Sequence, residues 1–160
     1  MIKEFFEDYN RYKQDRAANE KLTARLSSTG WVEVQCCKLR PGQIVKIKKE
    51  EESSADCLVI NSSNSNGYCY IDTKNLDGES NLKEKSSIEE YKLITEYSQL
   101  NGVVRCDKPN ENLHQFEGLI SKEVEENNDR LEQGGSNINK SLFVNMRNMI
   151  LKGCTLKNTE

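Results

Sequence analysis

The chain has 160 residues, of which 35% are hydrophobic and 31% charged, and its 23 basic and 26 acidic side chains give a net charge of −3. These charges are mixed along the chain, which argues against a basic field for binding nucleic acid or an anionic membrane surface. No stretch approaches the roughly 18 to 20 apolar residues that cross a bilayer. Length and composition therefore predict one soluble domain of ordinary size with a core of its own.

The amino-terminal segment carries large apolar side chains at steps of three and four. They are Ile2, Phe5, Phe6, Tyr9 and Tyr12. This spacing predicts one face of an amphipathic helix that runs to about Ala18. Because a helix of this length is only marginally stable alone, we expect its aromatic face to pack against another surface.

Alternation of apolar and polar residues after Gly30 predicts β-strands. Strands are expected over 31–36 and 44–48, joined by a tight turn at Pro41-Gly42, and again over 57–60 and 68–73. The last of these strands leads directly into an acidic loop. A reactive side chain on that loop would therefore be supported by a rigid sheet.

The second half of the chain predicts one helix and more strands. Ser86 and Ser87 can cap a helix over 88–100, and strands over 103–106 and 113–120 flank a turn at Pro109-Asn110. Residues 121–140 are rich in Glu, Asn and Gly, which is typical of an exposed, flexible insertion. Residues 142–156 return to strand-like composition and are expected to close the sheet.

The acidic loop is the candidate functional segment, and it reads Asn75-Leu76-Asp77-Gly78-Glu79-Ser80-Asn81-Leu82-Lys83. Two carboxylates flank a glycine that permits a tight turn. One leucine on each side, Leu76 and Leu82, is expected to anchor the loop. A carboxylate on a projecting loop can orient a water molecule and accept its proton. Asp-Gly is also a common turn dipeptide, so an acidic surface turn is the alternative interpretation.

This loop closely resembles the Asp-Gly-Glu-Thr loop of the lipid-flippase subfamily of P-type ATPases, with Ser80 in place of the threonine. Other segments are similar to the family in the same order. They lie in 2–19, 31–47, 55–63, 116–118 and 151–159. The resemblance implies the actuator domain of such an ATPase, with a mostly β (α+β) fold that has flanking helices and is distorted like a jelly roll.

The resemblance also implies an organisation of the chain. One actuator domain would cover 1–160, with a helical stalk over 1–20 that follows a membrane helix and rests on the domain. A β core over 30–120 would contain the helix 86–100. The flexible insertion 121–140 and a closing β segment over 141–160 would follow.

The resemblance further implies roles for the loop residues. Glu79 would position the water that attacks an aspartyl phosphate on a separate domain and would accept its proton. Gly78 would permit close approach, and Asp77 and Ser80 would shape the loop through hydrogen bonds. The fragment alone would then be inactive, because the phosphate it acts on lies elsewhere.

The implied partners are the phosphorylation and nucleotide domains of the same polypeptide, the flanking transmembrane helices and an accessory flippase subunit, with no nucleic acid. ATP and Mg²⁺ would be cofactors of the parent protein, and none is expected in the fragment, which has no phosphate-binding glycine loop. The domain would lie at the cytoplasmic face of a membrane. The parent would be an ATP-hydrolysing phospholipid translocase.

Some features depart from the family or lead elsewhere. Asp107-Lys108 is followed by Pro109, so it is not the phosphorylated Asp-Lys-Thr-Gly motif. The six cysteines lack CxxC spacing and the single histidine, His114, cannot complete a Cys2His2 zinc site, so reduced structural cysteines are expected. Two alternatives stay open: a regulatory flippase-like module fused to a guanylyl cyclase in a protist, and a stand-alone β-rich interaction module.

Overall fold

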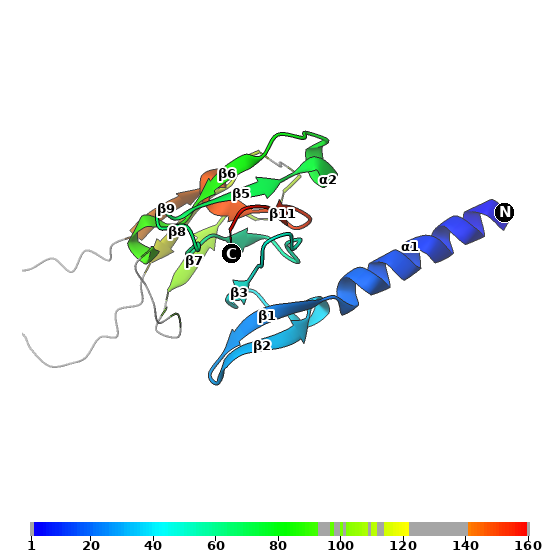
Figure 1. Ribbon diagram of the computed structural model, residues 1–160, viewed down its shortest axis with the longest axis horizontal. Helices are drawn as coiled ribbons and strands as arrows, with labels where there is room; N and C mark the ends of the chain where they lie inside the picture. Colours follow the sequence, from blue (N-terminus) through cyan, green and yellow to red (C-terminus); the bar gives the residue numbers. More distant parts are fainter. Residues whose placement is uncertain are drawn as a thin grey trace, which may run out of the picture.

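A projecting helix and several small antiparallel sheets make up the chain (Figure 1). The computed structural model describes residues 2–92, 97, 100, 102–108, 110–111, 114–121 and 141–159. The α-helices are α1 (Ile2–Glu20) and α2 (Lys74–Asp77), and the 3-10 turns are η1 (Cys36–Lys38), η2 (Glu89–Tyr91) and η4 (Met146–Asn148). The strands are β1 (Leu22–Ser27), β2 (Gly30–Gln35), β3 (Val45–Lys46), β4 (Cys57–Leu58), β5 (Tyr68–Asp72), β6 (Lys83–Ser86), β7 (Val103–Cys106), β8 (Glu117–Ser121), β9 (Ser141–Asn145), β10 (Met149–Ile150) and β11 (Thr155–Leu156). This mostly β architecture with flanking helices confirms the expected α+β class.

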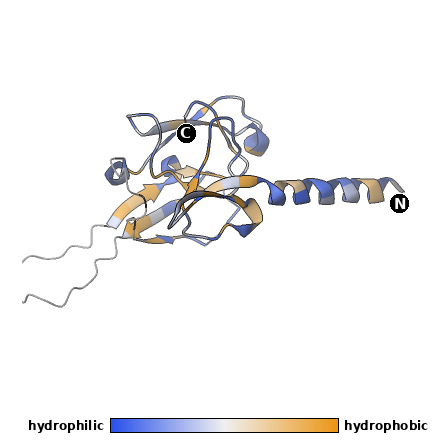
Figure 2. Cartoon of the chain, turned by 60° about the horizontal axis from the view of Figure 1, so that its bottom comes forward, coloured by the Kyte–Doolittle hydropathy of each residue, from blue (hydrophilic) through white to orange (hydrophobic). Residues whose placement is uncertain are grey.

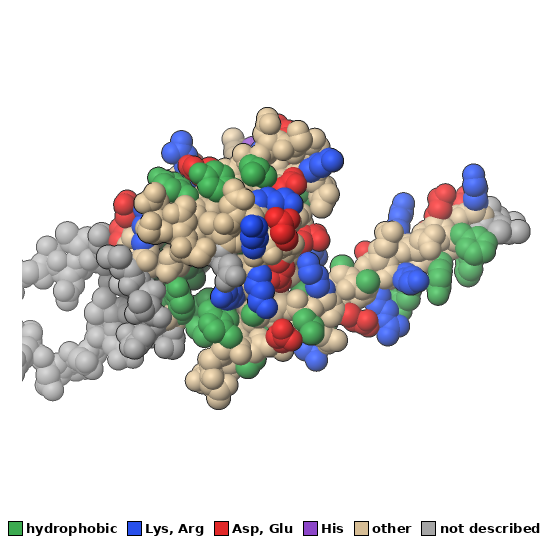
Figure 3. Space-filling view, viewed as in Figure 1, with side chains coloured by type: hydrophobic (Ala, Val, Ile, Leu, Met, Phe, Trp, Pro, Cys, Tyr) green, Lys and Arg blue, Asp and Glu red, His purple; other side chains and the backbone are tan. Residues whose placement is uncertain are grey.

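Helix α1 extends away from the body and does not rest on it. Its side chains from Lys3 to Glu20 are exposed along the whole length, and the hydrophobic ones near its N-terminal end gather on one side in the space-filling view (Figure 3). The expected helix is confirmed, but the expectation that its aromatic face packs on the domain is wrong. The i,i+4 ion pair between Arg16 and Glu20, 2.8 Å long, supports the last turns of the helix.

The first sheet has the order β2-β1-β3, which differs from the predicted pairing. Strand β1, which the sequence analysis did not predict, forms an antiparallel hairpin with β2 across Ser28-Thr29. Strand β3 pairs with β1 rather than with β2. The reason is local: the 3-10 turn η1 redirects the chain after β2, so the Pro41-Gly42 turn does not close a hairpin.

The sheet that carries the candidate loop has the order β11-β5-β6. Strand β6 was not predicted, because its Lys-Glu-Lys-Ser sequence lacks apolar alternation. It nevertheless alternates in burial, with Glu84 exposed and Lys85 buried. The long aliphatic stem of a lysine can occupy a buried strand position when its ammonium group finds a polar partner. A helix beginning at Ser86 is therefore not found.

The predicted helix over 88–100 lies only partly within the described residues. Its start is the 3-10 turn η2, in which Tyr91 is buried. Residues 93–96, 98 and 99 of this prediction lie outside the described residues, and so do 122–140, most of the predicted insertion. The predicted strand over 103–106 is confirmed as β7, whereas the strand predicted over 113–120 begins only at Glu117, as β8, because 114–116 are not in a strand. Both strands join β9 in one antiparallel sheet.

The core consists of two hydrophobic clusters, and hydrophobic residues accordingly concentrate in the strands of the body rather than in α1 (Figure 2). The first cluster is formed by Val59, Cys69, Ile71, Ile150, Cys154 and Leu156. The second is formed by Ile88, Tyr91, Ile120, Leu142 and Val144. Residues 58–60, at and after the end of β4, link them, since Val59 belongs to the first cluster while Leu58 and Ile60 pack against the second. This is the alternation expected of extended chain between two packed layers.

The cysteines carry free thiols, as expected. Cys69 and Cys154 are buried in the first cluster, and burial raises the pKa of Cys69 to about 11. These two side chains therefore act as small core hydrophobes and not as nucleophiles at neutral pH.

Ile71 is the residue whose truncation should most weaken the sheet that carries the loop. Its side chain is 1% exposed and lies at the centre of the first cluster. We expect Ile71→Ala to lower the free energy of unfolding by about 2–5 kcal/mol, measured by urea denaturation of the chain. Leu82→Ala is the matched control, because Leu82 is 47% exposed, and should change stability by less than about 0.5 kcal/mol. Equal stability of the two variants would contradict this description of the core.

Candidate functional site

The acidic loop connects two neighbouring antiparallel strands, β5 and β6. Ile71 near the end of β5 lies opposite Lys83 at the start of β6. The strand was predicted to lead directly into the loop; β5 ends at Asp72, and the first residues of the loop, from Asn75 to Asp77, lie in the short helix α2. Because the sheet holds both ends of the connection at one edge, the segment between them has limited freedom.

Helix α2 is attached to the body through its inner side. Leu76 packs against the first hydrophobic cluster, and the backbone N–H of Lys74 donates a 2.9 Å hydrogen bond to Asp72 Oδ1. Leu82, which was expected to be a second anchor, is exposed instead. The loop is therefore anchored on its α2 side and open to solvent at Leu82.

Gly78 ends α2 in a left-handed conformation. Its φ is +75° and its N–H donates to the carbonyl of Lys74 at 3.1 Å, the usual geometry of a glycine after a helix. A side chain built at this position would meet no atom within 4 Å. The glycine is thus needed for its backbone conformation, which costs other residues about 1–2 kcal/mol, and the space beside it is open.

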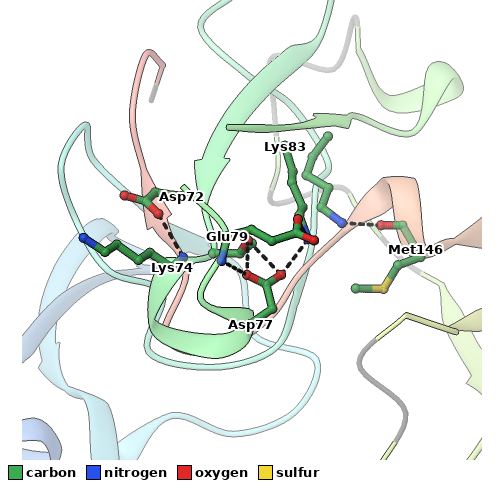
Figure 4. Close-up of polar contacts among 8 residues, drawn as sticks. Asp72, Lys74, Asp77, Glu79, Lys83 and Met146 are labelled. Carbon is green, nitrogen blue, oxygen red and sulfur yellow. Dashed lines mark hydrogen bonds and ion pairs between the residues drawn. The ribbon is translucent and has the colours of Figure 1, made fainter. Parts of the chain in front are cut away.

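Asp77 is the most constrained residue of the loop (Figure 4). Its carboxylate accepts 3.0 Å hydrogen bonds from the hydroxyl of Thr73 and from the backbone N–H of Glu79. It also accepts one from the ammonium group of Lys83 at 2.5 Å. With a side chain only 16% exposed, Asp77 fixes the shape of the turn from inside.

Glu79 lies at the exposed tip of the loop. Its side chain is 58% exposed, and its carboxylate forms a 3.0 Å ion pair with Lys83. Lys83 therefore bridges the two carboxylates of the loop, as Figure 4 shows. The sequence analysis quoted Lys83 as part of the family motif but gave it no role, and no pattern in the sequence indicated Thr73.

These contacts shift the protonation equilibria of the bridge. The hydrogen bond from Lys83, together with that from the backbone of Glu79, lowers the pKa of Asp77 to about 2. The hydrogen bonds that Lys83 donates to the carboxylate of Asp77 and, second in effect, to that of Glu79 raise the pKa of Lys83 above its ordinary value. At neutral pH the bridge therefore consists of one ammonium ion with Asp77 ionised beside it.

Ser80 and His114 lie near this bridge without belonging to it. Ser80 is exposed, and no hydrogen bond of its hydroxyl is found among the described residues, so the shaping contact expected of it is not found. His114 is also exposed and borders a cavity of about 120 Å³ that Asp77, Lys83 and Lys85 also line. The ammonium group of Lys85 is directed elsewhere, since it donates to the carbonyl of Met146 at 2.7 Å.

The described residues contain no group of three or more His, Cys, Asp or Glu side chains placed to hold a metal ion. The loop can therefore offer hydrogen bonds, a carboxylate base and a fixed ammonium charge. Those are the means by which a protein positions water at a reacting centre.

None of the helices that the structure describes combines the length and the apolar character that a bilayer crossing demands.

Comparison with known proteins decides the family. The sequence model described as the P-type ATPase actuator domain matches residues 17–157, which include the whole loop. The chain belongs to the P-type ATPase actuator-domain family. The alternative of a β-rich module unrelated to this family is thereby excluded.

Similar proteins include several phospholipid-transporting ATPases. Phospholipid-transporting ATPase 1 of Arabidopsis thaliana is 33% identical over 159 residues, which cover 99% of this chain and 12% of that protein. A relative from Schizosaccharomyces pombe is 43% identical over 122 residues, or 74% of this chain and 10% of its own length. One from Saccharomyces cerevisiae is 36% identical over 164 residues, which cover 99% of this chain and 11% of that protein. This actuator-domain chain thus spans about a tenth of the length of the curated relatives it matches.

The low pKa of Asp77 predicts how the domain responds to acid. We expect its carboxyl to titrate near pH 2 instead of its ordinary 3.8, as measured by the ¹³C shift of the side-chain carboxyl. Because the pKa is lower in the folded chain than in the unfolded chain, this group stabilises the fold above about pH 3.8 and loses that effect as the pH falls toward 2.

Two variants test the cause. Lys83→Met removes the largest contribution and should raise the midpoint of Asp77 toward 3.8. Lys74→Met should leave the titration midpoint of Asp77 unchanged, because no contact of the Lys74 side chain with Asp77 is found among the described residues. A midpoint of 3.8 in the unaltered chain would contradict the hydrogen bonds described here.

Proposed function

We propose that this chain is the actuator domain of a phospholipid-transporting P-type ATPase and that Glu79 drives hydrolysis of an aspartyl phosphate on a separate domain. The observation that carries the proposal is the exposed carboxylate of Glu79 at the tip of a loop whose inner part is held rigidly. Asp77 and Lys83 hold that inner part through hydrogen bonds and an ion pair. An exposed, supported carboxylate suits a base whose substrate arrives from outside the domain.

In the proposed reaction Glu79 accepts a proton from a water molecule while the oxygen of that water attacks the phosphorus atom. The bond between phosphorus and the aspartyl oxygen breaks, which releases inorganic phosphate and regenerates the aspartate. A positioned general base contributes roughly 10² to 10⁴ to such a rate. The domain supplies the base and its placement, and the phosphorylated aspartate belongs to its partner.

Gly78 and Ser80 suit a surface that meets another domain. The open space beside Gly78 lets the backbone approach a partner closely. The exposed hydroxyl of Ser80 is placed to hydrogen-bond with that partner. Asp77 acts inside the loop and keeps its turn in shape.

ATP and Mg²⁺ belong, in this proposal, to the phosphorylation and nucleotide domains of the same polypeptide. The described residues do not form a cation site of their own. Separating the base from the phosphorylated residue makes hydrolysis depend on the movement of one domain against another. That dependence is how dephosphorylation would be coupled to phospholipid translocation.

The organisation of the chain follows from the same proposal. The whole of 1–160 is one actuator domain at the cytoplasmic face of a membrane, with α1 as the stalk that joins it to a transmembrane helix. The exposed aromatic side of α1 is then available to neighbouring parts of the parent protein or to an accessory subunit. The relatives described above are all phospholipid-transporting ATPases, which supports the transporter over the cyclase-fused alternative.

Removing the base should trap the phosphorylated state of the parent protein. In the full-length ATPase we expect Glu79→Gln to accept phosphate from ATP normally and to lose it about 10² to 10⁴ times more slowly. The measurement is the decay of radiolabelled phosphoenzyme after a chase with unlabelled ATP.

Glu84→Gln provides the matched control. Glu84 is an exposed neighbour on β6 that accepts a hydrogen bond from Tyr70, away from the loop tip. Its phosphoenzyme should decay at the parental rate. Parental decay in Glu79→Gln would show that Glu79 is not the base.

A further inference from the structure

The backbone of Lys83 is held in place by the sheet. Lys83 is the first residue of β6, and its backbone lies opposite Ile71, a residue of the first hydrophobic cluster. Its side chain is 31% exposed, so the ammonium group is partly sheltered at the base of the loop. A charge attached to a strand is positioned more precisely than one attached to a loop.

The two carboxylates that Lys83 bridges are held very differently. Asp77 has three further hydrogen-bonding contacts, two with the Thr73 hydroxyl and one with the backbone of Glu79, and is mostly sheltered. The Glu79 carboxylate is mostly exposed, and Lys83 is the one partner found for it among the described residues. Asp77 therefore fixes the position of the ammonium group, and that group in turn sets the position of Glu79.

Other lysines nearby do not offer the same contact. Lys85, two residues along β6, is buried and donates to the carbonyl of Met146. Lys74 lies on α2 and points away from the bridge in Figure 4. Within the described part of the chain, Lys83 is thus the one side chain found to hold the Glu79 carboxylate, while the backbone of Glu79 is bound to Asp77.

We propose that Lys83 is a positioning residue for dephosphorylation, which holds the Glu79 carboxylate in the orientation it needs to activate water. This inference rests on the proposed function of Glu79. Lys83 also offsets one of the two negative charges of the loop, and so reduces the repulsion between the loop and an anionic phosphoryl group. The Asp77–Lys83 pair anchors the ammonium group from the side of the loop opposite to the exposed Glu79 carboxylate, for which Lys83 is the one partner found among the described residues.

The test compares phosphoenzyme decay in full-length variants of the ATPase. Lys83→Met keeps the length of the side chain and removes the charge, and we expect decay to slow by about 10- to 100-fold, as misplacement of a catalytic group does. Lys83→Arg keeps the positive charge, and its phosphoenzyme should decay faster than that of Lys83→Met. Lys74→Met, the matched control, should decay at the parental rate.

The double variant shows whether Lys83 acts through Glu79. Residues that work as a unit have non-additive effects, so Glu79→Gln combined with Lys83→Met should decay within about threefold of Glu79→Gln alone. Multiplied effects would overturn the proposal, and so would parental or faster decay in Lys83→Met.

Two controls separate the possible failures. Parental decay in Glu79→Gln would refute the proposed function itself, whereas slow decay in Glu79→Gln with parental decay in Lys83→Met refutes only the role of Lys83. The amount of phosphoenzyme formed from ATP reports on folding and should stay parental in each variant. If Lys83→Met does not fold, Lys83→Gln takes its place, with the same expected slowing and the same refuting result.

Discussion

The antiparallel pairing of β5 with β6 is the constraint on which the candidate site depends. Strand β5 is the middle strand of its sheet and contributes Cys69 and Ile71 to the first hydrophobic cluster, so its position is set by core packing. Pairing then brings Lys83 back beside Ile71. The loop is a long connection whose two ends cannot move apart, and this is why a few hydrogen bonds suffice to order it.

The loop has a fixed inner part and an exposed tip. Asp77 faces inward and satisfies its carboxylate with bonds from Thr73, Lys83 and the backbone of Glu79. Glu79, two residues later, faces solvent with a single ion pair. The left-handed turn at Gly78 makes this division possible, because it lets two neighbouring carboxylates take opposite surroundings. Two acidic residues in one motif thus have different surroundings for a structural reason.

Much of the fold could be predicted from local patterns, and the failures have physical causes. The aromatic spacing of α1 and the apolar alternation of β5, β7 and β8 indicate these elements because their patterns are strong. Strand β6 was not predicted because its buried residue is a lysine, a residue type that is usually exposed. Lys85 is buried here because its ammonium group donates to the backbone carbonyl of Met146, a contact that only the fold provides. The pairing of β1 with both β2 and β3 was not predicted, because pairing depends on how η1 redirects the chain. The outward direction of α1 was not predicted, because amphipathic spacing shows that one face of a helix is apolar but does not show what covers that face.

The sequence by itself determined the family and the location of the candidate loop, since the order of its motifs and the Asp77-Gly78-Glu79-Ser80 segment are properties of residue order alone. Only the tertiary structure decided how these residues are used. Thr73, Asp77 and Lys83 are brought together by the return of β6 along β5, and the resulting ion pairs orient Glu79 while leaving Ser80 open to solvent. Sequence patterns record which side chains are present, but the distances between charges, and hence the pKa of Asp77 and the role inferred for Lys83, arise only when the sheet is formed.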